Sequence, residues 1–266
     1  MWSKPMFKQI VRANYKLFVL FTGILCAYMA LCIGVFNPQT LGGLDTLMQS
    51  MGGMGEAFGS LMGDFQNVNS FIGHTFYGLI AVLFPMLYCI IVGNRLIAAQ
   101  VDRGSMANWL STPTRRNQIT GTSALFLGGS LLAMFAVTGA VGLGAGALFQ
   151  PGALAVSSFW MLNLGCFLLL FAISGICFAS SCTCNLSRTS LAWGAGIPVA
   201  FFLFQMIAQL APSLDFFRYL TIQSLFDPAA ILAGQGYAGA LVALGCIGLV
   251  CYAVGMQVFA RKDLPL

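Results

Sequence analysis

Six long apolar stretches constrain the fold of this chain more than any other feature of its sequence. Their interiors contain almost no charged side chains, and each is long enough to cross a hydrocarbon core of about 30 Å as a helix. Lipid offers no hydrogen-bond partners to the backbone, so each stretch is predicted to be a transmembrane helix. The six predicted spans are roughly 17–36, 74–97, 120–148, 157–181, 190–211 and 236–259.

The composition excludes a water-soluble fold. Of the 266 residues, 59% are hydrophobic and only 7% are charged, whereas soluble domains carry about 25% charged residues. We therefore expect an all-α polytopic membrane protein, with residues 1–266 forming a single transmembrane domain. The net charge of +5 is typical of the basic loops of membrane proteins, so no nucleic-acid partner is expected.

The amino terminus resembles the charged start of a signal peptide but is expected to stay on the protein. Its first residues, MWSKPMFKQIVRANYK, place four basic side chains before the first apolar run. The run at 17–36 is longer than the apolar region of about 7–15 residues in a signal peptide. We therefore interpret it as a retained first span.

The basic residues are distributed unevenly if the six spans alternate in direction. One side of the membrane receives eleven of them: Lys4, Lys8, Arg12, Lys16, Arg95, Arg103, Arg115, Arg116, Arg188, Arg261 and Lys262. The opposite side receives Arg218, together with Asp45, Glu56, Asp64, Asp215 and Asp227. Because cytoplasmic loops collect Lys and Arg, both termini are predicted to be cytoplasmic.

Two outer loops, 37–73 and 212–235, are more apolar than free loops usually are. Met48, Met51 and Met54 lie among glycines in the first loop and suggest an interfacial or re-entrant segment. A Cu(I) site is the alternative, but no Cys or His accompanies these methionines. In the second loop we expect short helices in the outer interface.

Several kinds of chemistry are missing from the sequence. The single histidine, His74, is interpreted as structural, and there is no H-E-x-x-H motif. None of the four lysines follows a glycine, so the chain has no P-loop for ATP. Seven of the nine cysteines lie in spans, where they act as small apolar residues. Cys182 and Cys184 lie at the predicted cytoplasmic side, where disulfides are rare; their C-x-C spacing is that of a metal site, but no further Cys/His pair joins them. No catalytic residue and no metal site are predicted.

The predicted cytoplasmic segment 98–117, here called the basic segment, contains a short amphipathic pattern. Met106, Trp109 and Leu110 stand at helical spacing and form one apolar stripe. Ser105 is a suitable N-cap and Pro113 marks the end of the helix. Such a helix either binds anionic lipid headgroups or docks onto a soluble partner.

At this segment the sequence resembles the permease subunits of ABC transporters, type-2 exporter class. Their typical pattern is I-A-x-E-x-x-x-G-(S/T)-(L/M)-x-x-L-L-S-x-P-x-(S/T)-R. The matching residues here are Ile97, Ala98, Gly104, Ser105, Met106, Leu110, Ser111 and Pro113; Trp109 stands at a leucine position, and Thr114 and Arg115 follow one position earlier than in the pattern. One departure is Gln100, which stands where the family usually has a glutamate and keeps a hydrogen bond without the charge. The order of spans and outer loops extends the resemblance over most of the chain.

The resemblance implies a transport subunit that is not itself an enzyme. Two cytoplasmic ATP-binding subunits would hold ATP and Mg, and a second permease, identical or related, would complete the pore. The residues expected to couple to the ATPase are Gln100, Asp102, Arg103, Gly104, Met106, Trp109, Leu110, Pro113, Arg115 and Arg116. Among these, the apolar stripe would enter a cleft of the ATPase and the arginines would form its charged rim.

The cargo path and the cargo are less constrained. Gln205 and Gln209 in the fifth span are candidates for the path, or are helix–helix hydrogen bonds. The apolar spans suggest an apolar path, which suits an amphipathic peptide, lipid or drug-like cargo. We expect this cargo to be exported across a bacterial cytoplasmic membrane. The main alternative is a stand-alone binding or immunity protein that sequesters a peptide or lipid without ATP. A lipid-modifying enzyme is disfavoured because no cluster of His, Asp and Glu is present.

Overall fold

A computed structural model describes residues 4–36, 68–104, 116–210, 212–234 and 236–262. This described part is 91% helical and contains no strand. The helices are α1 (Lys4–Val35), α4 (Val68–Ile72), the π-helix η1 (Gly73–Ile80), α5 (Ala81–Leu96), α6 (Ala98–Asp102), α8 (Arg116–Phe149), α9 (Val156–Thr183), α10 (Ser187–Leu210), the 3-10 helices η2 (Pro212–Leu220) and η3 (Ile222–Leu225), α11 (Pro228–Ala233) and α12 (Tyr237–Arg261).

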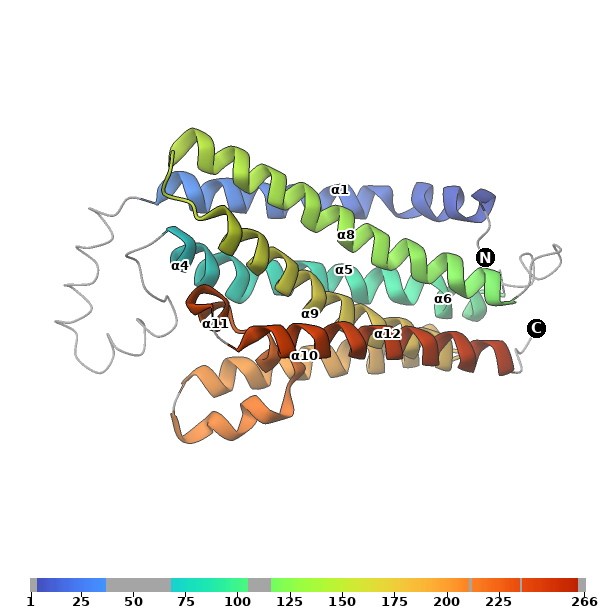
Figure 1. Cartoon of the computed structure of the whole chain (residues 1–266). Helices are drawn as coiled ribbons and strands as arrows, with labels where there is room; N and C mark the ends of the chain where they lie inside the picture. The colour runs from blue at the N-terminus through green and yellow to red at the C-terminus, as the bar shows by residue number, and fades with distance from the viewer. Residues whose placement is uncertain (1–3, 37–67, 105–115, 211, 235, 263–266) are drawn as a thin grey trace.

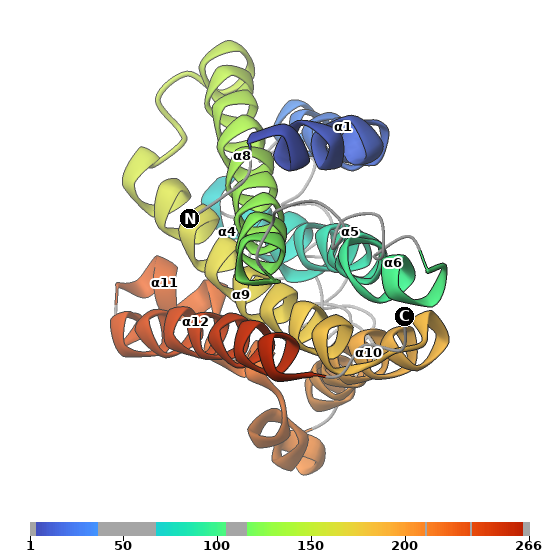
Figure 2. The same cartoon turned by 90° about the vertical axis from the view of Figure 1, so that its right-hand side faces the viewer.

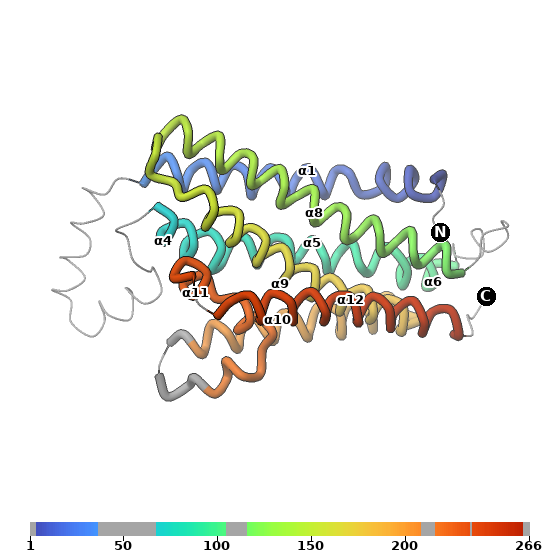
Figure 3. Tube along the Cα trace, viewed as in Figure 1, coloured from blue at the N-terminus to red at the C-terminus, as the bar shows by residue number. Residues whose placement is uncertain are grey.

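Six of the helical stretches are long and apolar enough to cross a membrane, which confirms the predicted fold class. They run back and forth along one axis, so that Lys4 and Arg261 lie at the same end of the bundle (Figures 1 and 3). We call this the terminal end, and the opposite end, with η2, η3 and α11, the far end. Among the described residues, the terminal end carries every basic side chain except Arg218.

Two spans extend beyond the apolar runs that predicted them. The helix α1 begins at Lys4, well before residue 17, and the second span continues from Val68 to Asp102. Long basic side chains keep their charges in water while their stems lie along apolar surface, so a helix can continue through the interface. Residues 68–73, placed in the first outer loop by the sequence, are the first turns of the second span.

The helix α9 lies at the centre of the bundle. It packs against α5, α8, α10 and α12, and Figure 2 shows it running between α8 and α12. Within its most apolar stretch, 67% of the residues are buried in the bundle, compared with 17% in the corresponding stretch of α10. The helix α10 thus lies at the edge of the bundle.

Glycines allow helices to approach α9 closely. A Cβ atom on Gly248 of α12 would lie 2.5 Å from the Phe171 ring of α9, and one on Gly142 of α8 would lie 2.5 Å from the Phe159 ring. The buried position of Gly142 shows that it serves helix packing and does not face lipid.

The second span contains an irregular stretch near the far end. Its first regular turns are interrupted by the π-helix η1, and Pro85 then lies inside α5. Proline has no N–H to donate to the carbonyl of residue i−4, which here is Ala81. The thiol of Cys166 on α9 donates to that carbonyl at 3.6 Å instead.

The far end is closed by three short helices, as the sequence led us to expect for this loop. Thr221 and Asp227 accept hydrogen bonds from the first N–H groups of η3 and α11, respectively. Gly234 and Gly236 have φ angles of +71° and +70°, which favour glycine, and they end α11 and begin α12. These turns fix the position of η3 and α11 against the spans.

Candidate coupling frame and far-end cavity

Polar side chains join α5 and α6 to the α9–α10 connection at the terminal end. The amide of Asn94 donates to the Ser187 hydroxyl at 2.7 Å. The backbone N–H of Ala98, at the start of α6, donates to the Ser181 hydroxyl at 2.9 Å. Both bonds link residues more than eighty positions apart, and they hold the start of the basic segment against two other spans.

Asp102 adds a third link at the start of α10. Its Oδ2 atom accepts a hydrogen bond from the backbone N–H of Ser187 at 3.3 Å. The first N–H groups of a helix have no partner within the helix, and the positive end of its dipole favours a carboxylate. Asp102 therefore caps α10 from a neighbouring element. We call Asn94, Ala98, Asp102, Ser181 and Ser187 the coupling frame.

The chain leaves α6 through an exposed turn. Arg103 and Gly104 are both exposed, and the φ angle of Gly104 is +69°. This left-handed conformation is one that glycine adopts without strain, and it commonly ends a helix.

Arg116, predicted as part of a charged rim for a partner, makes an internal contact. Its Nη1 atom donates to the backbone carbonyl of Lys262 at 2.7 Å. The Lys262 ammonium in turn donates to the carbonyls of Cys182 and Thr183 at 3.2 and 2.7 Å. Partial burial lowers the pKa of Lys262, while hydrogen bonds to carbonyl oxygens favour its charged form. The start of α8 and the ends of α9 and α12 are thereby joined.

Gln100 faces α1. Together with Arg95 it lines a small cavity of about 90 Å³, whose other wall includes Met6, Ile10 and Asn14 of α1. A glutamate at position 100, as in the family pattern, would thus share this cavity with the Arg95 guanidinium. The remaining predicted coupling residues, Met106, Trp109, Leu110, Pro113 and Arg115, lie outside the described residues.

A much larger cavity, of about 510 Å³, lies at the far end and is here called the far-end cavity. It is formed by η1 and α5 of the second span, by α10, and by η2, η3 and α11, with one residue of α9. Its lining residues are His74, Tyr77, Gly78, Leu79, Val82, Leu169, Phe202, Gln205, Met206, Ala208, Arg218, Gln223, Phe226, Asp227 and Pro228.

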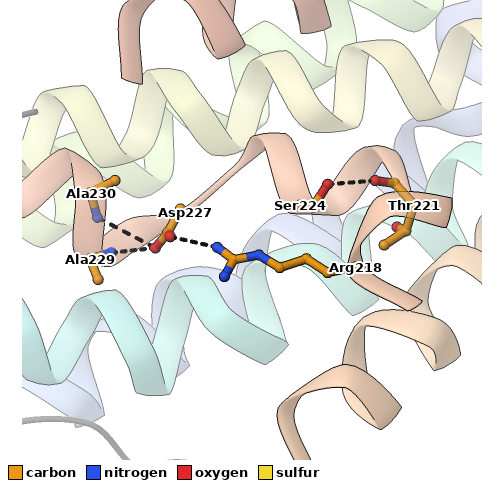
Figure 4. Close-up of polar contacts among 6 residues, drawn as sticks. All are labelled: Arg218, Thr221, Ser224, Asp227, Ala229 and Ala230. Carbon is orange, nitrogen blue, oxygen red and sulfur yellow. Dashed lines mark hydrogen bonds and ion pairs between the residues drawn. The ribbon is translucent and has the colours of Figure 1, made fainter. Parts of the chain in front are cut away.

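The polar groups of this cavity come from several elements. Gln205 from α10 and Gln223 from η3 bring amides to it, and His74 contributes the imidazole of η1. At its edge, the Arg218 and Asp227 side chains form an ion pair of 2.8 Å, which Figure 4 shows beside the start of α11. The cavity is therefore apolar over most of its wall, with a few polar groups, as is usual for small-molecule sites.

The structure describes the side chain of one of the two glutamines of the predicted cargo path. Gln205 lines the far-end cavity, while the side chain of Gln209 lies outside the described part. Sequence reasoning included Asp102 among the coupling residues but missed Gln223 and the partners of Asp102 in the coupling frame. A polar residue in an apolar loop was the available signal for Gln223, but pairing across eighty or more residues left no local signal for the frame.

Comparison with known protein families shows to which family the chain belongs. The family model for the ABC-2 family transporter protein matches residues 7–264. The chain belongs to this family. It is thus a membrane permease of an ABC transporter and a multi-pass membrane protein, and its family associates with ATP-binding cassette subunits. No curated protein matched the chain.

The two regions lie at opposite ends of the permease. The coupling frame includes Ala98 and Asp102 of the basic segment, where the sequence pattern of these permeases is found. The far-end cavity lies at the other end of the same helices. The helix α10 is shared by both regions, since it begins at Ser187 and carries Gln205.

Proposed function

We propose that this permease exports an amphipathic cargo across a bacterial cytoplasmic membrane, driven by two separate ATP-binding subunits that hold ATP and Mg. A second permease, identical or related, would complete the transporter, and the exposed edge helix α10 is a suitable surface for it. The terminal end would face the cytoplasm, because Lys and Arg collect there.

The observation that carries the proposal is the link between the basic segment and α10. Asp102, at the start of that segment, is hydrogen-bonded to the first residue of α10, and α10 reaches the far-end cavity with Gln205. Closure of an ATPase dimer against the basic segment would move α6, and α6 would pull on the start of α10. Such a switch needs contacts that differ between two states, and the single 3.3 Å bond of Asp102 is one that can exchange.

Co-purification tests the proposal. The natural chain, Trp109→Asp and Trp109→Phe would be isolated from native membranes in a mild detergent, and bound proteins identified by mass spectrometry. We expect an ATPase with a P-loop to accompany the natural chain and Trp109→Phe, and to be lost at least about tenfold with Trp109→Asp, because a buried unpaired charge weakens an interface by several kcal/mol.

The opposite result would favour the alternative function. If the natural chain retains no ATPase while it remains folded and monodisperse, the exporter proposal fails. The basic segment would then be a lipid anchor, and a stand-alone binding or immunity role would take its place.

A further inference from the structure

The far-end cavity has two side-chain amides in its wall, besides His74, the Arg218–Asp227 pair and a larger apolar part. Gln205 reaches it from α10 and Gln223 from η3, so two separate elements contribute the same chemical group. Around them lie Phe202, Met206 and Phe226. The volume of about 510 Å³ lies in the range of sites that take drug-sized ligands.

Both amides have an oxygen without a partner. The Oε1 atoms of Gln205 and Gln223 are buried, and no donor among the described residues reaches them. Gln223 as a whole is only 5% exposed. A buried acceptor without a hydrogen bond costs about 1–3 kcal/mol. If the side-chain amide rotates so that its oxygen faces the cavity, a ligand that donates a hydrogen bond to this oxygen recovers that free energy.

The charges of the cavity cancel. Its described wall contains one guanidinium group, that of Arg218, and one carboxylate, that of Asp227, and the two form an ion pair. Asp227 is further engaged by the N–H groups of Ala229 and Ala230 through its Oδ1 atom (Figure 4). A ligand with a net charge would have to compete with these contacts, whereas an uncharged polar group would not.

An amide is the uncharged group that fits a glutamine side chain best. A side-chain amide carries both a donor and an acceptor, and a ligand amide can pair with both at once, whichever way the side chain is turned. An ester accepts without donating, and a lipid tail does neither. A tail in the cavity would leave both amide oxygens without partners.

We propose that the far-end cavity binds an uncharged amphipathic peptide or carboxamide, whose amide groups pair with Gln205 and Gln223 while its apolar side chains contact the aromatic and methionine wall. As a statement about cargo, this rests on the proposed export function. The binding itself requires no ATPase and is measured on the permease alone, so the two proposals fail separately.

Three fluorescent probes test the proposal on the natural chain, purified into nanodiscs of phosphatidylcholine. Dansyl-Phe-Leu-NH2 carries two carboxamides, its depsipeptide analogue (leucic acid methyl ester in place of leucinamide) replaces both by esters of similar size, and monodansylcadaverine carries an ammonium group; all three share the dansyl sulfonamide. Dansyl emission is titrated against protein, and empty nanodiscs are subtracted. We expect saturable binding of the amide, and binding of the ester and the ammonium probe at least about tenfold weaker.

Variants locate the site. Gln205→Leu and Gln223→Leu keep the side-chain volume and remove the amide, so each should weaken binding of the amide probe about tenfold and leave the ester unchanged. Gln257→Leu is the matched control, because Gln257 is exposed on α12 and does not line the cavity. Gly78 lines the cavity with room for a Cβ, so Gly78→Phe should block all three probes.

Two results would overturn the proposal. Equal affinity of the amide, ester and ammonium probes for the natural chain would show that Gln205 and Gln223 do not distinguish an amide from the other groups. This measurement depends on no variant. Saturable binding of the amide probe that survives both Gln205→Leu and Gln223→Leu in folded protein would place the ligand elsewhere.

Discussion

Single residues at the helix contacts show how little space the bundle leaves around α9. At Gly142 a methyl group would collide with the buried Phe159 ring, whereas Gly144 on the same helix is exposed and has nothing within 4 Å of its Cβ position. The packing thus excludes a side chain at Gly142 but leaves room for one at Gly144.

We therefore predict opposite effects of alanine at these two positions. Gly142→Ala should lower the free energy of unfolding by about 1–3 kcal/mol, as overpacking does, while Gly144→Ala should raise or keep it because alanine favours helix. Thermal unfolding of the two variants in the same detergent measures the difference. An equal or smaller loss for Gly142→Ala would contradict the close packing of α8 on α9.

At the scale of elements, the short helix α6 matters through its contact with α10. Asp102 supplies a cap that the sequence of α10 itself lacks, since the residue before Ser187 is Leu186. A cap that belongs to a different element makes the stability of the first turn of α10 depend on where α6 lies.

Removal of that cap should loosen the first turn of α10 specifically. We predict that Asp102→Ala costs about 1 kcal/mol there, which corresponds to about fivefold faster hydrogen exchange of the hydrogen-bonded amides of Ser187 and Ser190. Arg103→Ala, at the neighbouring exposed position, is the control and should leave these amides unchanged. Hydrogen exchange of both variants is measured by mass spectrometry. Unchanged exchange in Asp102→Ala would contradict the inference that α6 stabilises the first turn of α10.

The elements also show what the sequence could and could not predict. The six spans follow from uninterrupted apolar runs, which is why they were predicted, and Gln205 was noticed as a polar residue inside such a run. The extension of α1 to Lys4 was missed because its basic first turns carry no apolar signal. The π-helix η1 and the pairing of Asp102 with Ser187 depend on tertiary contacts, which no local pattern encodes.

At the scale of the whole molecule, the terminal and far ends have different proposed partners. The terminal end would meet the ATP-binding subunits through the basic segment, and the far end would hold the cargo. The two are joined by helices that run the length of the bundle, α10 among them (Figure 1). A movement at one end can then change the cavity at the other without any chemistry on this chain.

Site-specific photo-crosslinking tests this central claim most directly. A benzoylphenylalanine would replace either Trp109, in the basic segment, or Tyr219, which is 87% exposed at the far end. Cells would be irradiated and the adducts identified by mass spectrometry. We predict that position 109 yields an adduct with a P-loop ATPase and that position 219 does not. An ATPase adduct from position 219, or none from position 109 in a chain that is inserted and folded, would contradict the account.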